Sequence, residues 1–152
     1  MNIERKSINT QSAPRALGPY SQAIITDGLI FTSGQIPLNP MTGNIVEGDF
    51  KQRVMQVLKN INAVLEAGGT EFSSILKMTV FLTDLSRFSI VNEVFSDQFK
   101  GIEPPARSVV EVAGLPMNAD IEIEANVETG KGYVSAEVAE DENKIIGEIK
   151  LD

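Results

Sequence analysis

The sequence of 152 residues contains no cysteine and no histidine, and these two absences exclude several classes of site. Without cysteine the chain has no disulfide, no thiolate metal ligand and no thiol nucleophile. Without histidine it has no Ser-His-Asp triad, no zinc held by imidazoles and no imidazole acid–base step. Any catalysis must therefore use carboxylates, Arg, Lys, Tyr, Ser, Thr and backbone groups.

Long apolar runs are missing as well. No stretch approaches the roughly 18–20 apolar residues that a membrane span requires, and the charged residues 1–6 are not followed by the apolar segment of a secretory signal. The 13 basic and 21 acidic residues give a net charge of −8, which is a poor match for a phosphate backbone. We therefore expect a soluble, cytoplasmic protein that depends on neither membranes nor nucleic acid.

The apolar pattern predicts a β-hairpin followed by helix, strand, helix, strand and strand. Asp27-Gly28 lies between two β-rich runs, as is typical of a two-residue type I′ turn. Asp49 and Gln52 form the pattern of a capping box, and the helix that they open ends at Gly68-Gly69. The later elements are predicted as strands over 75–82, 108–112 and 120–128, and as a second helix with Ser86 at its N-cap. The apolar stripe of that helix is formed by Phe88, Val91, Val94, Phe95 and Phe99.

This order predicts an α+β domain in which two helices pack on one face of a mixed β-sheet. An apolar second face would need a covering partner, so the pattern favours a homo-oligomer. We assign residues 1–128 to the domain and residues 129–152 to a C-terminal extension. In that extension 133–138 and 144–151 are predicted to pair as a hairpin, with a flexible tail as the alternative.

Two types of charged residue stand out as candidates for binding and chemistry. Arg107 follows two prolines that stiffen the backbone, and its planar guanidinium is suited to gripping a carboxylate, although a surface ion pair would explain it equally. Glu122 and Glu124 lie on one face of the last strand, which is usually a solvated face. If that face lines a cleft between subunits, a carboxylate there could hold a water molecule as nucleophile.

Further polar groups accompany them. Tyr20 follows a Gly-Pro turn and is either a buried ring or a polar tip aimed at a ligand. Ser33-Gly34 ends a strand and offers backbone amides at close approach. Asn92 is a polar residue between apolar positions of the second helix, where an exposed side chain is the ordinary explanation. None of these signals decides the function by itself.

Taken together, the segments resemble the RidA (YjgF/YER057c/UK114) family over residues 13–127, and the enamine/imine deaminase subgroup in particular. The motifs that carry the resemblance, in family order and spacing, are Gly18-Pro19-Tyr20-Ser21-Gln22-Ala23, Thr32-Ser33-Gly34-Gln35-Ile36-Pro37, Leu82-Thr83-Asp84, Val91-Asn92-Glu93-Val94-Phe95, Pro105-Ala106-Arg107-Ser108 and Ile121-Glu122-Ile123-Glu124-Ala125. The resemblance implies a chorismate-mutase-like α+β subunit and a homotrimer whose sheets form an inner barrel, with three clefts between subunits.

The resemblance also implies roles for individual residues. Arg107 matches the arginine that grips the carboxylate of 2-iminopropanoate or 2-iminobutanoate, Glu122 the glutamate that positions the hydrolytic water, and Tyr20 the tyrosine that orients the ligand. The remaining expected substrate-binding residues are Ser33, Gly34, Asn92 and Val109, and Val109 stands where relatives often carry Cys. No metal and no cofactor are implied. The extension over 129–152 departs from the family pattern.

The implied activity is hydrolysis of reactive 2-enamine and 2-imine acids to 2-oxo acids and ammonia, which protects pyridoxal phosphate enzymes from damage. An iminium carbon is already electrophilic, so a held water and good positioning suffice without His, Cys or metal. One alternative is a trimer that binds 2-oxo acids or similar small carboxylates without turnover. Another is the ribonuclease or holdase activity of some relatives, although the charge of −8 and the lack of histidine count against an RNA enzyme.

Overall fold

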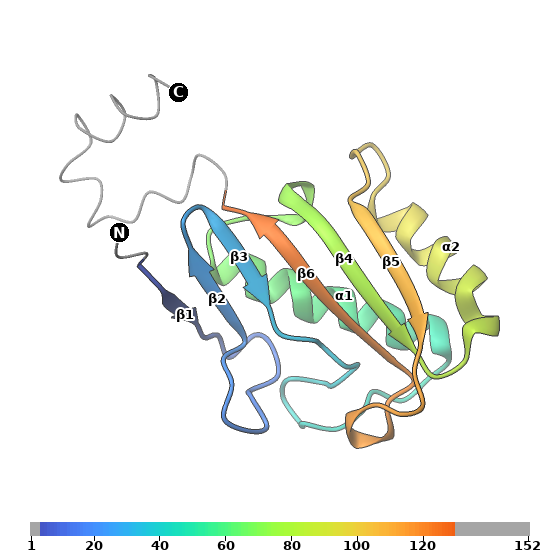
Figure 1. Ribbon diagram of the computed structural model, residues 1–152. Coiled ribbons are helices and arrows are strands. Elements are labelled where there is room, and N and C mark those ends of the chain that lie inside the picture. Colours follow the sequence, from blue (N-terminus) through green and yellow to red (C-terminus); the bar gives the residue numbers. More distant parts are fainter. Residues whose placement is uncertain (1–3, 130–152) are drawn as a thin grey trace.

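A computed structural model describes residues 4–129 as a six-stranded sheet with two helices on one face (Figure 1). The strand order is β1-β2-β3-β6-β4-β5, and all neighbours are antiparallel except β4 and β5. The elements are β1 (Lys6–Ile8), β2 (Ala23–Thr26), β3 (Leu29–Thr32), α1 (Phe50–Ala67), η1 (Phe72–Ser74), β4 (Ile75–Leu82), η2 (Leu85–Arg87), α2 (Phe88–Gln98), β5 (Ala106–Glu111), η3 (Pro116–Asn118) and β6 (Ile121–Glu128). This confirms the predicted mixed sheet with two helices. Most of the C-terminal extension, with its possible hairpin, lies outside the described residues.

The turn between β2 and β3 has the predicted conformation. Asp27 and Gly28 both have positive φ, 47° and 77°, and Thr26 pairs with Leu29 across the turn. Type I′ turns need this backbone at both central positions, and their twist matches that of the flanking strands. The hairpin brings the segment that follows β3 beside the end of the sheet where β6 begins.

Helix α1 begins at the predicted capping box. The Asp49 carboxylate accepts a hydrogen bond from the Gln52 backbone amide, and the Gln52 side chain accepts one from the Asp49 amide, both at 2.9 Å. The two glycines at its end have different purposes. Gly69 has a φ of 75°, whereas a Cβ on Gly68 would lie 2.7 Å from the side chains of Ile8 and Ile30. The helix therefore ends in a close contact with the sheet.

The start of the second helix differs from the prediction. Ser86 is not its N-cap: the Asp84 carboxylate accepts from the Ser86 amide at 3.0 Å, which opens the 3₁₀ turn η2, and α2 begins only at Phe88. Strand β1 was not predicted, because a three-residue edge strand is too short to show an alternating pattern. Strand β4 matches its predicted bounds, and β5 and β6 match theirs to within two residues.

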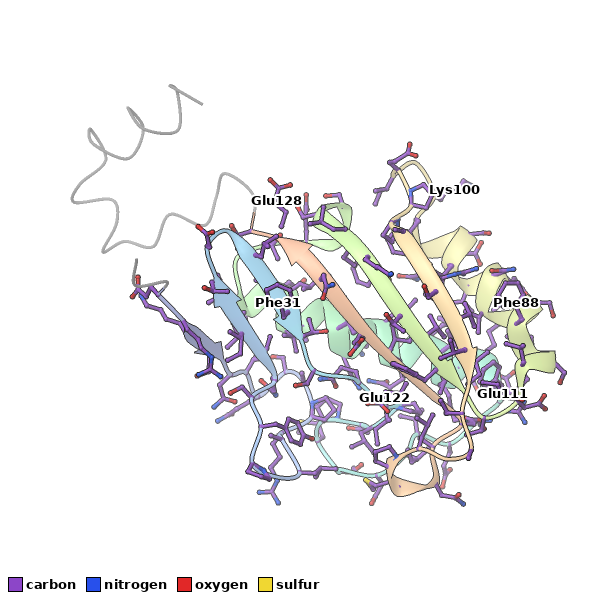
Figure 2. All side chains as sticks on the ribbon, viewed as in Figure 1. Phe31, Phe88, Lys100, Glu111, Glu122 and Glu128 are labelled. Atoms are coloured by element: carbon purple, nitrogen blue, oxygen red, sulfur yellow. The ribbon has the colours of Figure 1, made fainter. Side chains whose placement is uncertain are left out.

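One face of the sheet is buried against the helices and the other is open. Met78, Val80, Ile121 and Ile123 point toward the helices and are fully buried in the core. The opposite, open face carries alternate residues of the same strands together with Phe31 and Val110, which are 43% and 40% exposed. Figure 2 looks onto this face and shows Phe31, Glu122 and Glu128 on it, while α1 passes behind the strands. Among residues 4–129, no helix is long and apolar enough to cross a membrane.

Candidate functional site

A cavity of about 390 Å³ opens where β6 begins, beside the loops that precede β2 and follow β3. It brings together four of the residues that the sequence singled out: Tyr20, Ser33, Gly34 and Glu122. Glu122 comes from the open face of β6, and the other three come from the two loops. Residues separated by about a hundred positions in the chain thus line one pocket.

The loop before β2 is held by Gln22, which is only 3% exposed. Its side-chain amide donates to the carbonyls of Pro14 at 2.8 Å and Thr10 at 3.0 Å, and its Oε1 accepts from the Thr10 amide at 2.7 Å. The Tyr20 hydroxyl accepts from the Leu17 amide at 2.9 Å. Sequence reasoning missed Gln22 as an anchor, because a polar residue before a strand looks the same whether it is buried or exposed.

The segment after β3 is fixed against both the loop that precedes β2 and strand β6. Ser33 Oγ donates to the Ser21 carbonyl at 2.6 Å, and Gln35 and Ile123 exchange two backbone hydrogen bonds of 2.8 and 3.0 Å. Between these anchors, Gly34 lies against the Glu122 side chain. A Cβ on Gly34 would overlap Glu122 Oε1 and lie 2.7 Å from its Cδ. Only glycine therefore leaves the carboxylate where it is.

Two carboxyl groups at the start of β6, those of Glu122 and Asp120, have pKa values shifted in opposite directions. Burial raises the pKa of Glu122, and the negative charge of Glu124 on the same face raises it further. Burial also acts on Asp120, but Arg53 and Arg87 outweigh it and lower the pKa of that carboxyl. Arg53 grips Asp120 through Nε and Nη2, at 3.0 and 2.6 Å from Oδ2, and Arg87 binds the same oxygen at 2.7 Å. The clamp ties the start of β6 to α1 and η2.

Arg107 lies in a second cavity of about 710 Å³, together with Asn92 and Phe95 of α2 and with Pro104 and Pro105. Its Nη2 donates to Asn92 Oδ1 at 2.7 Å. Its Cζ lies 5.0 Å from the centre of the Phe95 ring, a distance typical of a cation–π contact. Burial lowers the pKa of Arg107, although a guanidinium stays charged at neutral pH.

Phe88 flanks the same guanidinium, with its ring centre 5.3 Å from Cζ. Within residues 4–129, no carboxylate lies at ion-pair distance from Arg107. Phe88 and Phe95 were predicted only as part of an apolar stripe, and their contact with a cation depends on where β5 lies beside α2. Val109, two positions along β5, packs partly against the core. The result is a positioned cation that no acid of the described part of the chain neutralises.

The two cavities lie on opposite sides of the sheet. Arg107 pairs with Met78, whose side chain is in the core, so both point toward the helices. Glu122 pairs with Phe81 of the same strand β4, which belongs to the open face. Strand spacing of about 4.8 Å and a rise of about 3.3 Å per residue put the two Cα atoms about 14 Å apart. A single subunit therefore does not bring Arg107 and Glu122 together.

Arg107 and Glu122 are suited to binding an anion and to orienting water rather than to holding a metal. Within residues 4–129 no three carboxylates converge in a way that could hold a metal ion. The guanidinium of Arg107 presents a fork for a carboxylate, and Glu122 presents an acceptor for a water molecule.

Comparison with known proteins covers the domain almost completely. The model of the family described as endoribonuclease L-PSP matches residues 10–129. The human 2-iminobutanoate/2-iminopropanoate deaminase is 44% identical over 124 residues, which make up 82% of this chain and 90% of that protein.

Solved structures show the same fold. The Escherichia coli YjgF gene product superposes with a TM-score of 0.77 at 45% identity, covering 81% of this chain and 98% of that one. The E. coli protein TdcF, solved with bound serine, gives a TM-score of 0.78 at 43% identity with the same coverage.

We predict that replacing Glu124 changes the ionisation of Glu122. In Glu124→Gln the like charge is gone, so the pKa of Glu122 falls toward its usual value but stays above it because the burial remains. Carboxyl-carbon NMR titration of the two proteins measures this directly. Glu128→Gln, at the far end of the same strand, is the matched control and leaves the Glu122 pKa unchanged. A wild-type Glu122 pKa at or below the ordinary value would contradict the effect assigned to burial and to Glu124.

Proposed function

Because the chain belongs to the RidA/RutC family, which the endoribonuclease L-PSP model describes, we propose that it is a 2-iminobutanoate/2-iminopropanoate deaminase. Its subunit has the chorismate-mutase-like α+β fold of the YjgF structures. The observation that carries the proposal is the pair of half-sites: the Arg107 guanidinium, which has no acid partner among residues 4–129, and the carboxylate of Glu122, which has a raised pKa and lies against Gly34. These are the groups that hydrolysis of a small carboxylated imine needs.

The active assembly in this proposal is a homotrimer with its sites between subunits. Arg107 of one subunit and Glu122 of a neighbour complete one cleft, since the two residues of a single subunit face opposite sides of its sheet. Phe31 and Val110 on the open face supply apolar area for the contact between subunits. A cyclic arrangement repeats the same contact at each interface.

Each residue then has a distinct part in binding. The Arg107 guanidinium grips the substrate carboxylate bidentately, and Asn92 holds the guanidinium in place. Tyr20 orients the ligand, and the backbones of Ser33, Gly34 and Val109 close the pocket around it. Because the sheet and the loops fix these groups before substrate arrives, little ordering entropy is lost on binding.

Glu122 acts on the water. The ionised carboxylate accepts a hydrogen bond from a water molecule and so orients the water oxygen toward C2 of the imine. The water oxygen bonds to C2, the imine nitrogen takes up both protons of the water, and the C2–N bond breaks to give a 2-oxo acid and ammonia. Since only the ionised form can act as a base toward the water, the rate falls as the pH drops through the raised pKa of Glu122.

A second candidate function is binding without turnover. The TdcF structure with bound serine favours it, because that relative holds a small amino acid. A non-catalytic trimer would use Arg107 in the same way but would not need Glu122. The endoribonuclease description of the family points to a third function, which the net charge of −8 and the absence of histidine disfavour in this chain.

We predict that Arg107→Ala abolishes the activity. Loss of the bidentate grip on the carboxylate lowers the hydrolysis of 2-iminopropanoate and 2-iminobutanoate, measured as 2-oxo acid release in excess of buffer, at least about a hundredfold. Lys100→Ala, the control, removes an exposed cation from the loop between α2 and β5 and leaves the rate unchanged. No excess over buffer from a folded wild-type trimer would refute the deaminase. In that event, equal affinity of wild type and Glu122→Gln for a 2-oxo acid would support binding without turnover.

We also predict that Gly34→Ala disables the site without unfolding the protein. The new methyl group displaces the Glu122 carboxylate, and a misplacement of about 1 Å can cost about a hundredfold in rate. The three nearest atoms to the new methyl group, Cγ, Cδ and Oε1, all belong to the flexible Glu122 side chain, so the melting temperature stays close to that of wild type. Gly114→Ala, where a Cβ meets nothing, is the control and keeps full activity. Full activity in Gly34→Ala would contradict the assigned position of Glu122.

A further inference from the structure

Arg15 is a cation of the Glu122 cavity that the proposed reaction does not use. It lines the cavity together with Tyr20, Ser33 and Glu122, and its side chain is exposed. Among residues 4–129, no carboxylate forms an ion pair with it, and no hydrogen bond to its guanidinium is made. Its charge is therefore available to a ligand.

The backbone around Arg15 is fixed on both sides. Ala13 and Pro14 before it are buried, and the Pro14 carbonyl accepts the 2.8 Å hydrogen bond from Gln22. After it, the Leu17 amide donates to the Tyr20 hydroxyl at 2.9 Å. The side chain thus starts from a defined point on the cavity wall rather than from a loose loop, which reduces the entropy lost when it binds an anion.

The lining of the cavity carries two charged side chains of opposite sign, Arg15 and Glu122. Of the residues that line it within the described chain, Arg15 is the one base and Glu122 the one acid. Both residues line the same cavity of about 390 Å³, and among residues 4–129 no ion pair joins them. The raised pKa of Glu122, caused by burial and by the charge of Glu124, agrees with this arrangement. A substrate can lie in the cavity and contact both charges.

We propose that Arg15 binds a second carboxylate of the substrate, so that the protein accepts 2-imino dicarboxylic acids, the imines of aspartate and glutamate type. The inference rests on the proposed function. Arg107 of a neighbouring subunit holds the carboxylate next to C2, Glu122 holds the water, and the distal carboxylate reaches Arg15. A cavity of about 390 Å³ is in the range of ordinary small-ligand sites.

The chemistry at C2 is the same for this substrate class. Water oxygen bonds to C2, its protons pass to the nitrogen, and the C2–N bond breaks to give ammonia and a 2-oxo dicarboxylic acid. Both carboxylates leave unchanged, and no further reactant is needed. Arg15 is thus a specificity-determining residue, which offsets the repulsion between an additional anionic group and the carboxylates of Glu122 and Glu124.

The test compares two substrates in four proteins. 2-Iminopropanoate and 2-iminoglutarate are generated from alanine and glutamate by an amino-acid oxidase or dehydrogenase, and kcat/KM is measured for wild type, Arg15→Ala, Arg15→Lys and Arg5→Ala. We expect Arg15→Ala to lose about tenfold on 2-iminoglutarate, or about 1.4 kcal/mol, with little change on 2-iminopropanoate. Arg15→Lys keeps part of the rate, and Arg5→Ala, an exposed arginine outside the cavity, keeps all of it.

Binding gives a second measurement that does not need turnover. Calorimetric titration with 2-oxoglutarate and 2-oxobutanoate should show that Arg15→Ala weakens only the dicarboxylate. Equal losses on both ligands, or none on either, would overturn the assignment of Arg15 and leave the deaminase intact. If wild type hydrolyses 2-iminopropanoate no faster than buffer does, the proposed function fails instead, and selective loss of 2-oxoglutarate binding would still support the second carboxylate site.

Discussion

The register of strand β4 with its two neighbours is the constraint on which the site depends. β4 pairs in parallel with β5 and antiparallel with β6, so it fixes the side of the sheet for residues on both. With this register Arg107 lies with Met78 on the helix side, and Glu122 lies with Phe81 on the open side. A slip of one residue in β6 would bury Glu122 and Glu124 in the core and expose the apolar residues between them. The hydrophobic core therefore maintains the position of the carboxylate.

The end of β6 where Glu122 lies is secured twice. Asp120 is clamped by Arg53 and Arg87, and the backbone of Ile123 is hydrogen-bonded to Gln35. Between these anchors Glu122 is half-buried with no cation paired to it among residues 4–129, and burial raises its pKa. Such uncompensated burial is costly in a purely structural residue and useful in one that holds water. At the neighbouring Asp120, by contrast, Arg53 and Arg87 compensate the buried negative charge, as is typical of a carboxylate with a structural role.

Much of this arrangement was predictable from the sequence. The alternation along 121–128, the Asp27-Gly28 turn and the Asp49 capping box are local signals, and the structure has all three. The side of the sheet for Arg107 was not predictable, because β5 is an edge strand whose residues are exposed or half-buried on both faces. The anchoring by Gln22 and the contact of Phe88 with Arg107 depend on distant parts of the chain, which no local pattern encodes.

The central claim, that Arg107 of one subunit works with Glu122 of another, is tested most directly by mixing two inactive proteins. Arg107→Ala and Glu122→Gln are each assayed alone and then co-refolded in equal amounts, with the hydrolysis of 2-iminopropanoate above buffer as the readout. If the sites lie between subunits of a cyclic trimer, random mixing restores about a quarter of the wild-type activity, because each mixed trimer has one intact site. If mixed trimers form and no activity returns, the two residues do not act across an interface, and the account is wrong.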